Sequence, residues 1–270
     1  MRSRWIRWTA LAAMLPLAAA CGDDTSGPSN DGARVTFSIS VSQSGAAMSR
    51  VAGDALFAML PVTDGTRTVD IQSVELVLRE IELERQDSDD CADHVEGEDD
   101  SCEEFETGPT LLDLPLDGGG VAQAFEVTGV PAGFYDEVEF KVHKPESDPG
   151  DDAFLLAHSE FDGVSIRVTG TYDDGLGGGP QPFTFVSDMS QEQEYDLVPP
   201  LEVGAGMSAN VTLQVDVTTW FLDGDQDVID PSTASTGGPN ESVVEENIQN
   251  SLHLYEDEDR DGDDDHGEVS

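Results

Sequence analysis

Four acidic residues near the C-terminus have the types and the spacing of a calcium-binding loop. Asp257, Asp259, Asp261 and Glu268 match the pattern D-x-D-x-D-G-x₅-E, with Gly262 at the position of the sharp turn. Ca²⁺ prefers hard oxygen ligands, and such a loop supplies carboxylates from its first, third, fifth and twelfth positions. The sequence therefore predicts a Ca²⁺ site in this segment.

The acidic character of this segment supports an alternative, because a run of acidic residues matches the same pattern by chance. Asp264 occupies the eighth position of the loop, where an apolar residue is usual. Two predictions thus remain for residues 256–270. They form either a weak, solvent-exposed site with an affinity on the order of 10⁻⁴ to 10⁻³ M, as in extracellular modules, or a disordered acidic tail of solvated charges.

A second acidic cluster follows a predicted strand that ends near Trp220. Asp223, Asp225 and Asp227 alternate along the chain, so their carboxylates could converge on one cation. Val228 stands where the loop pattern has its glycine, and no glutamate occupies the twelfth position. These departures favour an ordinary turn, with a metal site as the alternative.

No arrangement of residues in the sequence predicts an enzyme. The 5 histidines are scattered, and there is no H-E-x-x-H zinc motif, G-x-S-x-G elbow, phosphate-binding loop or dinucleotide fingerprint. His143, at the end of a predicted strand, is expected to be a surface residue. We expect a non-catalytic protein, with a secreted metal-assisted hydrolase that uses the cluster at 223–230 as the alternative.

The N-terminus predicts export and attachment to a membrane. Residues 1–20 begin with basic residues and continue into a short apolar run that ends in alanines, as signal peptides do. The end of this run and Cys21 resemble a bacterial lipobox, although Ala18 stands where leucine is usual. Cys21 is therefore predicted to carry a lipid, and residues 21–33 to form a flexible tether. The alternative is ordinary cleavage after Ala20.

The other two cysteines are predicted to form a disulfide bond. Cys91 and Cys102 are an even pair in an acidic loop, and an exported protein meets an oxidising compartment. A bridge between them would contribute about 3 kcal/mol through loop-closure entropy. A metal–thiolate site is less favoured, because only His94 lies nearby as a further soft ligand.

The charge of the chain excludes one class of partner. It contains 12 Lys and Arg against 57 Asp and Glu, for a formal net charge of −45. Nucleic-acid phosphates would be repelled over the whole surface, so we expect no nucleic-acid binding. Three explanations of the charge remain: adaptation to high salt, binding of divalent cations, and solubility.

Short alternating runs separated by turns predict a mainly β protein, with an antiparallel β-sandwich over residues 34–222. In the segment 69–84 the apolar residues change parity after Leu78, as a bulged strand requires, although one helix face fits the same residues. Segments 164–172 and 182–186 read as a hairpin. The other predicted strands are 34–41, 110–116, 121–127, 135–143 and 211–217.

A short helix is predicted after the sandwich. Residues 223–239 are expected to form an acidic linker, and residues 240–255 an amphipathic helix. Ser242 and Glu245 have the spacing of a capping box at the start of this helix. One helix face would carry four apolar residues: Val244, Ile248, Leu252 and Tyr255.

Four strand-like segments support a family resemblance: IQSVEL (71–76), TLLDLPL (110–116), VPAGFYDEV (130–138) and VTLQVDV (211–217). They are similar to an uncharacterised bacterial lipoprotein domain that is catalogued as a domain of unknown function. The resemblance covers roughly residues 34–222. It implies a β-sandwich of the transthyretin-like kind, a location in the cell envelope, and a non-enzymatic domain without catalytic residues.

Overall fold

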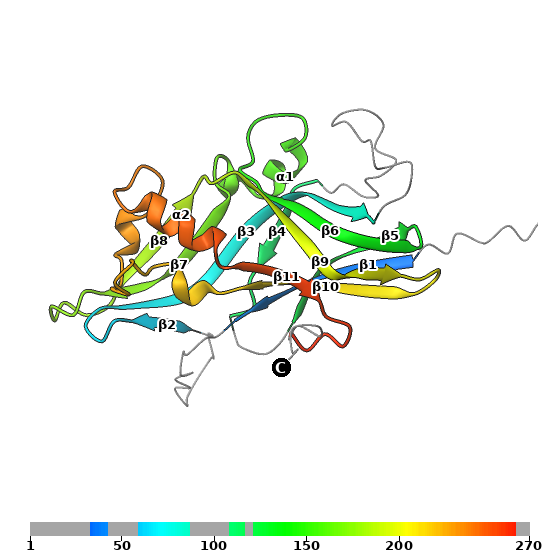
Figure 1. Cartoon of the computed structure of the whole chain (residues 1–270). Coiled ribbons are helices and arrows are strands. Elements are labelled where there is room, and N and C mark those ends of the chain that lie inside the picture. Colours follow the sequence, from blue (N-terminus) through cyan, green and yellow to red (C-terminus); the bar gives the residue numbers. More distant parts are fainter. Residues whose placement is uncertain (1–32, 43–58, 87–107, 117–120, 263–270) are drawn as a thin grey trace, which may run out of the picture.

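Two β-sheets that share one hydrophobic core form the body of the protein (Figure 1). The computed structural model describes residues 33–42, 59–86, 108–116 and 121–262. Within these ranges the chain is mainly β and its strand pairs are mostly antiparallel, which confirms the predicted sandwich. No helix in the same ranges has the length and the apolar character that crossing a membrane requires.

The sandwich is built from strands of 4 to 18 residues and a few short helices. The strands are β1 (Ala33–Val41), β2 (Leu60–Thr63), β3 (Thr68–Arg85), β4 (Thr110–Asp113), β5 (Ala122–Val130), β6 (Gly133–Val142), β7 (Ile166–Asp173), β8 (Gln181–Ser187), β9 (Gln191–Val203), β10 (Ser208–Val215) and β11 (Leu252–Glu256). The helices are α1 (Asp152–Ala157) and α2 (Glu241–Gln249), with the 3₁₀ helices η1 (Ser159–Phe161), η2 (Val217–Thr219) and η3 (Pro231–Thr233).

The smaller sheet has four strands in the order β11-β10-β1-β5. β1 pairs in parallel with β10 and antiparallel with β5. Val35, Phe37 and Ile39 alternate along β1 and are buried in the core, as the sequence predicts. Thr36 and Ser38, which point to the opposite face, are buried as well. Both faces of this strand are therefore covered.

The larger sheet has seven strands and is organised around β3, a strand of 18 residues. β2, β4, β6 and β7 all pair with β3. The predicted bulge lies at Glu80, which has a φ of 53°, and the pairing with β6 shifts between Arg79 and Glu82. The irregularity turns Ile81 and Leu83 toward the core, where both are buried.

Large side chains from both sheets and from the C-terminal segments fill the core. Trp220 and Phe221, just after β10, are fully buried. Phe221 meets the ring of Phe185 edge-on, with ring centroids 5.3 Å apart. Burial of a side chain of this size contributes about 1.5 to 3 kcal/mol to stability. The segment after β10 is thus part of the folded body.

The predicted helix over residues 240–255 is wrong in its second half. α2 ends at Gln249, and the residues that follow form β11, which pairs antiparallel with β10. Val244 and Ile248 are buried on α2 as predicted, but Leu252 is buried within the sheet, opposite Val215. The open edge of β10 supplies hydrogen-bond partners, and this tertiary pairing overrides the helical period.

The predicted capping box of α2 is also absent. Asn240 is the N-cap residue, and no side chain caps the helix through a hydrogen bond. The Oε1 atom of Glu245 instead accepts a hydrogen bond from Ser187 Oγ at 2.8 Å. Glu245 therefore connects α2 to the end of β8.

Residues 223–239 are not a linker but belong to the folded body. An isolated bridge pairs Leu222 with Val228, and Val228 and Ile229 are both buried. The N–H of Ile229 donates a hydrogen bond to the carbonyl of Phe221 at 2.9 Å. The sandwich thus extends beyond its predicted limit at residue 222.

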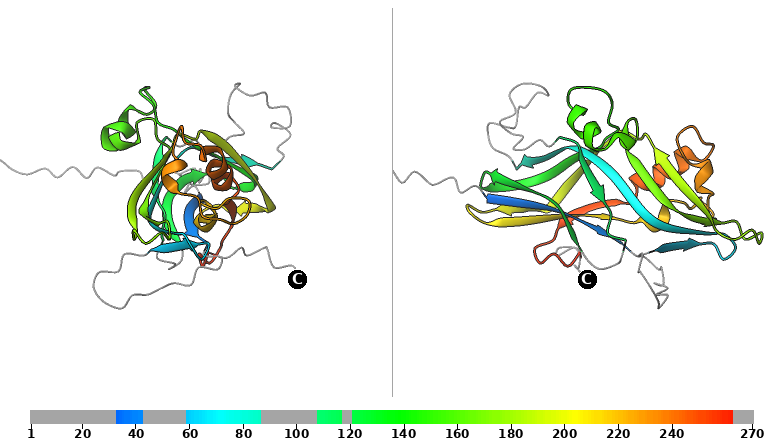
Figure 2. Two further views of the ribbon diagram at one scale, coloured as in Figure 1. Left: turned by 90° about the vertical axis from the view of Figure 1, so that its left-hand side faces the viewer. Right: turned by 180° about the vertical axis from the view of Figure 1, so that it is seen from behind.

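The two ends of the elongated molecule differ (Figures 1 and 2). β1 begins at one end, where the N–H of Arg34 donates a hydrogen bond to the carbonyl of Met207 in the turn between β9 and β10. Two large apolar side chains are exposed at this end: Phe134 by 51% and Met207 by 65%. The hairpin of β7 and β8 projects at the opposite end.

Candidate cation site

The candidate site begins with one buried carboxylate, that of Asp257, directly after β11. Its Oδ2 atom accepts hydrogen bonds from Thr212 Oγ1 at 2.8 Å and from the N–H of Gly262 at 3.2 Å. Its Oδ1 atom accepts one from the N–H of Asp261 at 3.1 Å. These donors offset the large penalty for burying a charge. Residues 256–262 are therefore folded, which contradicts the disordered tail that was one of the two predictions for this segment.

Three aspartates of this loop converge as the calcium pattern predicts. Asp257, Asp259 and Asp261 each offer one carboxylate oxygen, and these atoms lie within 4.8 Å of one another. Gly262 has a φ of 90°, a conformation that glycine adopts readily. Asp259 and Asp261 are exposed, so a cation can reach them. Glu268, the predicted twelfth-position ligand, lies outside the described residues.

The loop rests on a row of polar side chains on the outer face of the smaller sheet. Ser38 Oγ donates a hydrogen bond to Asn210 Oδ1 at 2.7 Å. Asn210 Nδ2 donates to Thr212 Oγ1 at 3.1 Å and to the carbonyl of Asp257 at 2.9 Å. All of these side chains are buried. The loop thus covers a sheet face that the alternation of β1 and β10 marks as polar.

The second predicted metal cluster forms a turn. Asp223 Oδ1 accepts hydrogen bonds from the N–H groups of Asp225 at 2.9 Å and Asp227 at 3.0 Å. In the described part of the chain, these three aspartates are not among the acidic groups whose ligand atoms converge within 4.8 Å. The carboxylate of Asp223 therefore stabilises the backbone of the turn.

His143 is not the surface residue that the sequence predicts. Its side chain is buried, and its Nε2 atom lies 2.9 Å from Oδ2 of Asp151, which is completely buried. The N–H of Glu146 donates a hydrogen bond to the same oxygen at 2.9 Å, and Arg79 Nη1 lies 3.4 Å from the other oxygen. These contacts connect the segment before α1 to β3 and β6. The sequence carries no signal for this cluster, because the segment folds back on the sheet only in the tertiary structure.

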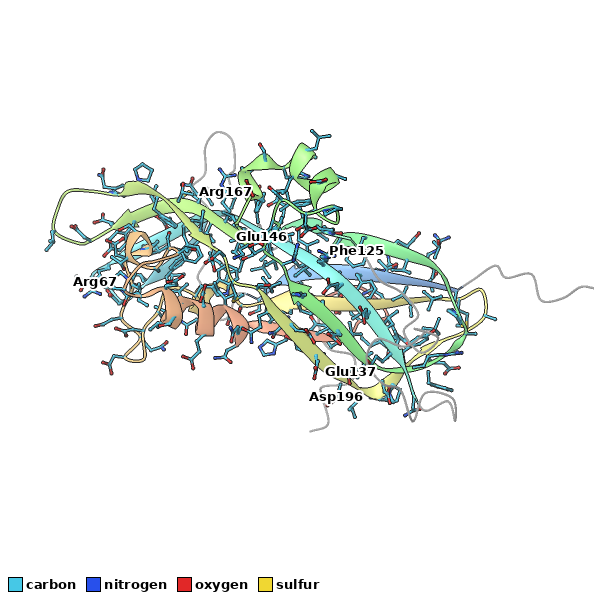
Figure 3. The ribbon with its side chains drawn as sticks, turned by 90° about the horizontal axis from the view of Figure 1, so that it is seen from above. Arg67, Phe125, Glu137, Glu146, Arg167 and Asp196 are labelled. Atoms are coloured by element: carbon cyan, nitrogen blue, oxygen red, sulfur yellow. The ribbon has the colours of Figure 1, made fainter. Side chains whose placement is uncertain are left out.

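Sequence reasoning also missed an acidic ladder on the outer face of β3, β6 and β9. Acidic residues stand opposite one another on neighbouring strands, and Figure 3 labels one such pair, Glu137 and Asp196. Like charges in directly opposite positions destabilise a sheet. The two rows of the ladder are Glu82–Glu139–Glu194 and Glu84–Glu137–Asp196.

Burial and repulsion raise the pKa values of two members of the acidic ladder. Burial first, and then a hydrogen bond and repulsion from Glu192, raise the pKa of Glu139 from 4.5 to about 8. The pKa of Glu137 is raised by burial and then by repulsion from Glu84. Glu139 is therefore mainly protonated at neutral pH, which relieves part of the repulsion in the ladder.

Acidic side chains converge elsewhere as well, so convergence alone does not single out the C-terminal loop. Ligand atoms also lie within 4.8 Å of one another in three further groups: Glu84, Glu137 and Glu139; Glu139, Glu192 and Glu194; and Asp188, Glu241 and Glu245. The C-terminal loop differs in that its spacing and its turn glycine match a known cation-binding pattern.

Comparisons of the chain with protein-family models, curated proteins and solved structures find no match. The resemblance to a bacterial lipoprotein domain therefore stays a prediction. Cys21, Cys91 and Cys102 lie outside the described residues, so the lipid attachment and the disulfide bond stay predictions too.

Proposed function

We propose that this chain is a lipoprotein of the bacterial cell envelope, with a non-catalytic β-sandwich that serves as a binding or structural module. A cation such as Ca²⁺ stabilises its C-terminal loop. The observation that carries the cation-binding part of this proposal is the convergence of Asp257, Asp259 and Asp261 in a loop that folds over the smaller sheet.

The position of β1 supports attachment through the N-terminus. β1 begins at the end of the sandwich that exposes Phe134 and Met207. A lipid on Cys21 would hold this end of the sandwich near the membrane, since the segment from residue 21 to 33 spans at most about 40 Å when extended.

The arrangement of carboxylates in the C-terminal loop supports a stabilising role for the cation. The three converging carboxylates repel one another, and a divalent cation between them would replace this repulsion by attraction. Because the loop covers buried polar side chains of β1 and β10, its stability contributes to that of the whole sheet. With an affinity on the order of 10⁻⁴ to 10⁻³ M, about 10 mM Ca²⁺ would add about 1.4 to 2.7 kcal/mol.

The cation is tested by thermal unfolding of the purified full chain after chelation of bound metal. CaCl₂ should raise Tm well above the value in NaCl of the same ionic strength. Asp259→Asn and Asp261→Asn should abolish this difference, whereas Asp225→Asn, in the turn at 223–227, should keep it. An equal response to NaCl, or an unchanged response in both loop variants, would contradict the cation site.

The anchor and the absence of catalysis are tested separately. Metabolic labelling with a palmitate analogue should label the wild-type chain and leave Cys21→Ala unlabelled. Equal labelling of the two chains, or none in the wild type, contradicts the lipoprotein. A panel of hydrolase substrates should show no turnover with or without Ca²⁺. Turnover by the wild type that is lost in Asp225→Ala would contradict the non-catalytic module and support the alternative, a hydrolase.

A further inference from the structure

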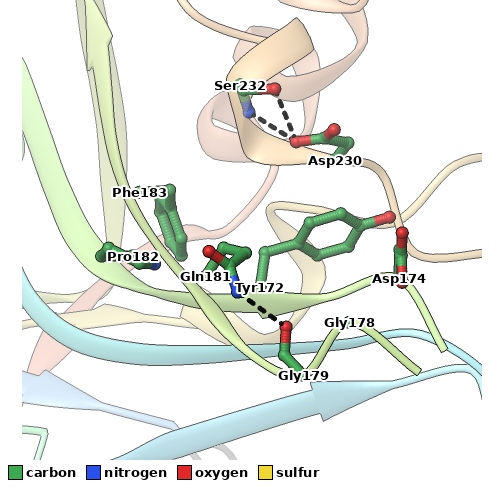
Figure 4. Close-up of a pocket in the computed structure, with 9 residues that line it drawn as sticks. All are labelled: Tyr172, Asp174, Gly178, Gly179, Gln181, Pro182, Phe183, Asp230 and Ser232. Carbon is green, nitrogen blue, oxygen red and sulfur yellow. Dashed lines mark hydrogen bonds between the residues drawn. The ribbon is translucent and has the colours of Figure 1, made fainter. Parts of the chain in front are cut away.

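A pocket of about 350 Å³ opens beside the hairpin of β7 and β8 (Figure 4). This hairpin lies at the end of the molecule opposite the start of β1 (Figure 1). The size of the pocket is within the usual range for small-molecule sites. The pocket is lined by the hairpin and by Asp230 and Ser232 at the start of η3. It is independent of the C-terminal loop and of the lipid anchor.

Two aromatic residues, Tyr172 and Phe183, line the pocket. Tyr172 stands opposite Gln181, and Gly170 stands opposite Phe183, so Tyr172 and Phe183 are diagonal neighbours on one face of the hairpin. A Cβ atom on Gly170 would lie only 2.9 Å from the ring of Phe183. The glycine thus lets this ring lie against β7, where it also meets the ring of Phe221 edge-on, with ring centroids 5.9 Å apart.

Two carboxylates give the pocket a negative potential. Asp174 follows β7, and Asp230 stands at the start of η3, where its Oδ1 atom accepts hydrogen bonds from the N–H and Oγ of Ser232 at 2.9 and 2.8 Å (Figure 4). Burial first, and then the charge of Asp230, raise the pKa of Tyr172. Asp174 adds to this rise, and Arg67 opposes it. The phenol of Tyr172 therefore lies in the field of both carboxylates.

Arg67 offsets part of this field, because its charge lowers the pKa of Tyr172 by more than Asp174 raises it, though by less than Asp230 does. Its Nη1 atom donates a hydrogen bond to the carbonyl of Val228 at 2.7 Å and lies 3.9 Å from Asp64 Oδ2. Neither Asp174 nor Asp230 has an ion pair with it among the described contacts. The pocket therefore combines aromatic faces with negative charge.

We propose that this pocket binds a small organic cation, whose ammonium group lies against the ring of Tyr172 and beside Asp230. A cation is attracted by the negative face of an aromatic ring and by a carboxylate, and both attractions grow when water is displaced. The net charge of −45 also concentrates cations around the molecule. A neutral sugar could stack on the same ring but would gain nothing from this field.

Choline and its uncharged carbon isostere, 3,3-dimethylbutan-1-ol, distinguish charge from shape in a test of this proposal. Calorimetric titration of the purified full chain, in chelator and physiological NaCl, should show choline binding at least about tenfold more tightly than the isostere. Equal binding of the two compounds, preferential binding of glucose, or no choline binding up to about 50 mM would overturn the proposal.

Variants locate the binding. Tyr172→Leu removes one ring and Asp230→Asn removes one charge while keeping an acceptor for Ser232, so each should weaken choline binding by about fivefold or more. Asp225→Asn removes the same charge outside the pocket and should leave the affinity unchanged. Circular dichroism of each variant should match that of the wild type, which checks that the variant is folded. If Tyr172→Leu binds choline as the wild type does, or if Asp225→Asn weakens binding equally, choline is a diffuse counterion and the pocket proposal is wrong.

Discussion

Two acidic side chains, Asp257 and Glu139, show how neighbouring groups decide what a carboxylate does in this protein. Asp257 is buried but accepts three hydrogen bonds, so it organises a loop around itself. Glu139 faces other carboxylates on both neighbouring strands, and its pKa rises to about 8. The same side-chain chemistry thus stabilises one region and strains another.

Replacement of Glu139 by glutamine should stabilise the protein at alkaline pH. The folded protein binds a proton at Glu139 that the unfolded chain releases, because the pKa is about 8 instead of 4.5. The stabilisation that comes from proton binding at Glu139 is therefore fully present below about pH 4.5 and is lost as the pH rises through about 8. Glutamine cannot ionise, so the variant should gain up to about 1 kcal/mol at about pH 9.

Urea unfolding of the wild type and of Glu139→Gln at acidic and alkaline pH measures this effect. Glu202→Gln is a matched control, because Glu202 is an exposed residue of β9 that stands opposite Phe134 rather than an acidic residue. The control should keep the wild-type pH profile. A profile of Glu139→Gln that also parallels the wild type would show that the acidic ladder carries no strain.

At the scale of elements, strands with a clean alternation could be predicted from the sequence. Val211, Leu213 and Val215 identify β10, and the change of parity after Leu78 identifies the bulge in β3. These predictions succeed because the alternation of apolar and polar residues indicates which face of a strand is buried. The alternation does not indicate that β1 pairs in parallel with β10, because register and direction depend on distant segments.

The missed elements are those that only tertiary contacts stabilise. β9 is acidic and contains Pro199 and Pro200, so its sequence does not read as a strand, yet β6 pairs with it. β11 was missed because the helical spacing of apolar residues in α2 continues through Leu252, and the sequence therefore predicts helix there. In the candidate site, the spacing of the aspartates could be predicted, but the burial of Asp257 could not. Its donor Thr212 lies on another strand.

The close approach of β3 and β7 predicts a large effect of one methyl group. A Cβ atom on Gly170 would lie 2.1 Å from the carbonyl oxygen of Asp70, a backbone atom that no rotamer change can move. Gly170→Ala should therefore lower the free energy of unfolding by about 1 to 3 kcal/mol. Gly178→Ala, in the turn of the same hairpin, meets no atom within 4 Å and should have little effect. Equal stability of the two variants in urea would contradict the pairing of β3 with β7.

At the scale of the whole molecule, the charge is far from balanced. Most of the basic side chains in the described structure already lie in ion pairs, such as Arg34 with Glu126, Arg167 with Glu75 and Lys144 with Glu146. The net charge of −45 shows that carboxylates greatly outnumber them. Folding brings these carboxylates together, so self-repulsion opposes the compact state.

Simple salt should therefore stabilise the protein, even without Ca²⁺. The Debye length falls from about 10 Å at 0.1 M to about 3 Å at 1 M, so NaCl screens the repulsion between carboxylates on the surface. It also weakens the exposed ion pairs, but these contribute only about 0–1 kcal/mol each. Tm should consequently rise steadily with NaCl at neutral pH. The rise should persist in Asp259→Asn and Asp261→Asn, because screening acts on the whole surface and a bound cation acts at one loop. A Tm that falls with NaCl would mean that the ion pairs outweigh the repulsion, and a rise that both variants abolish would assign the salt effect to the loop.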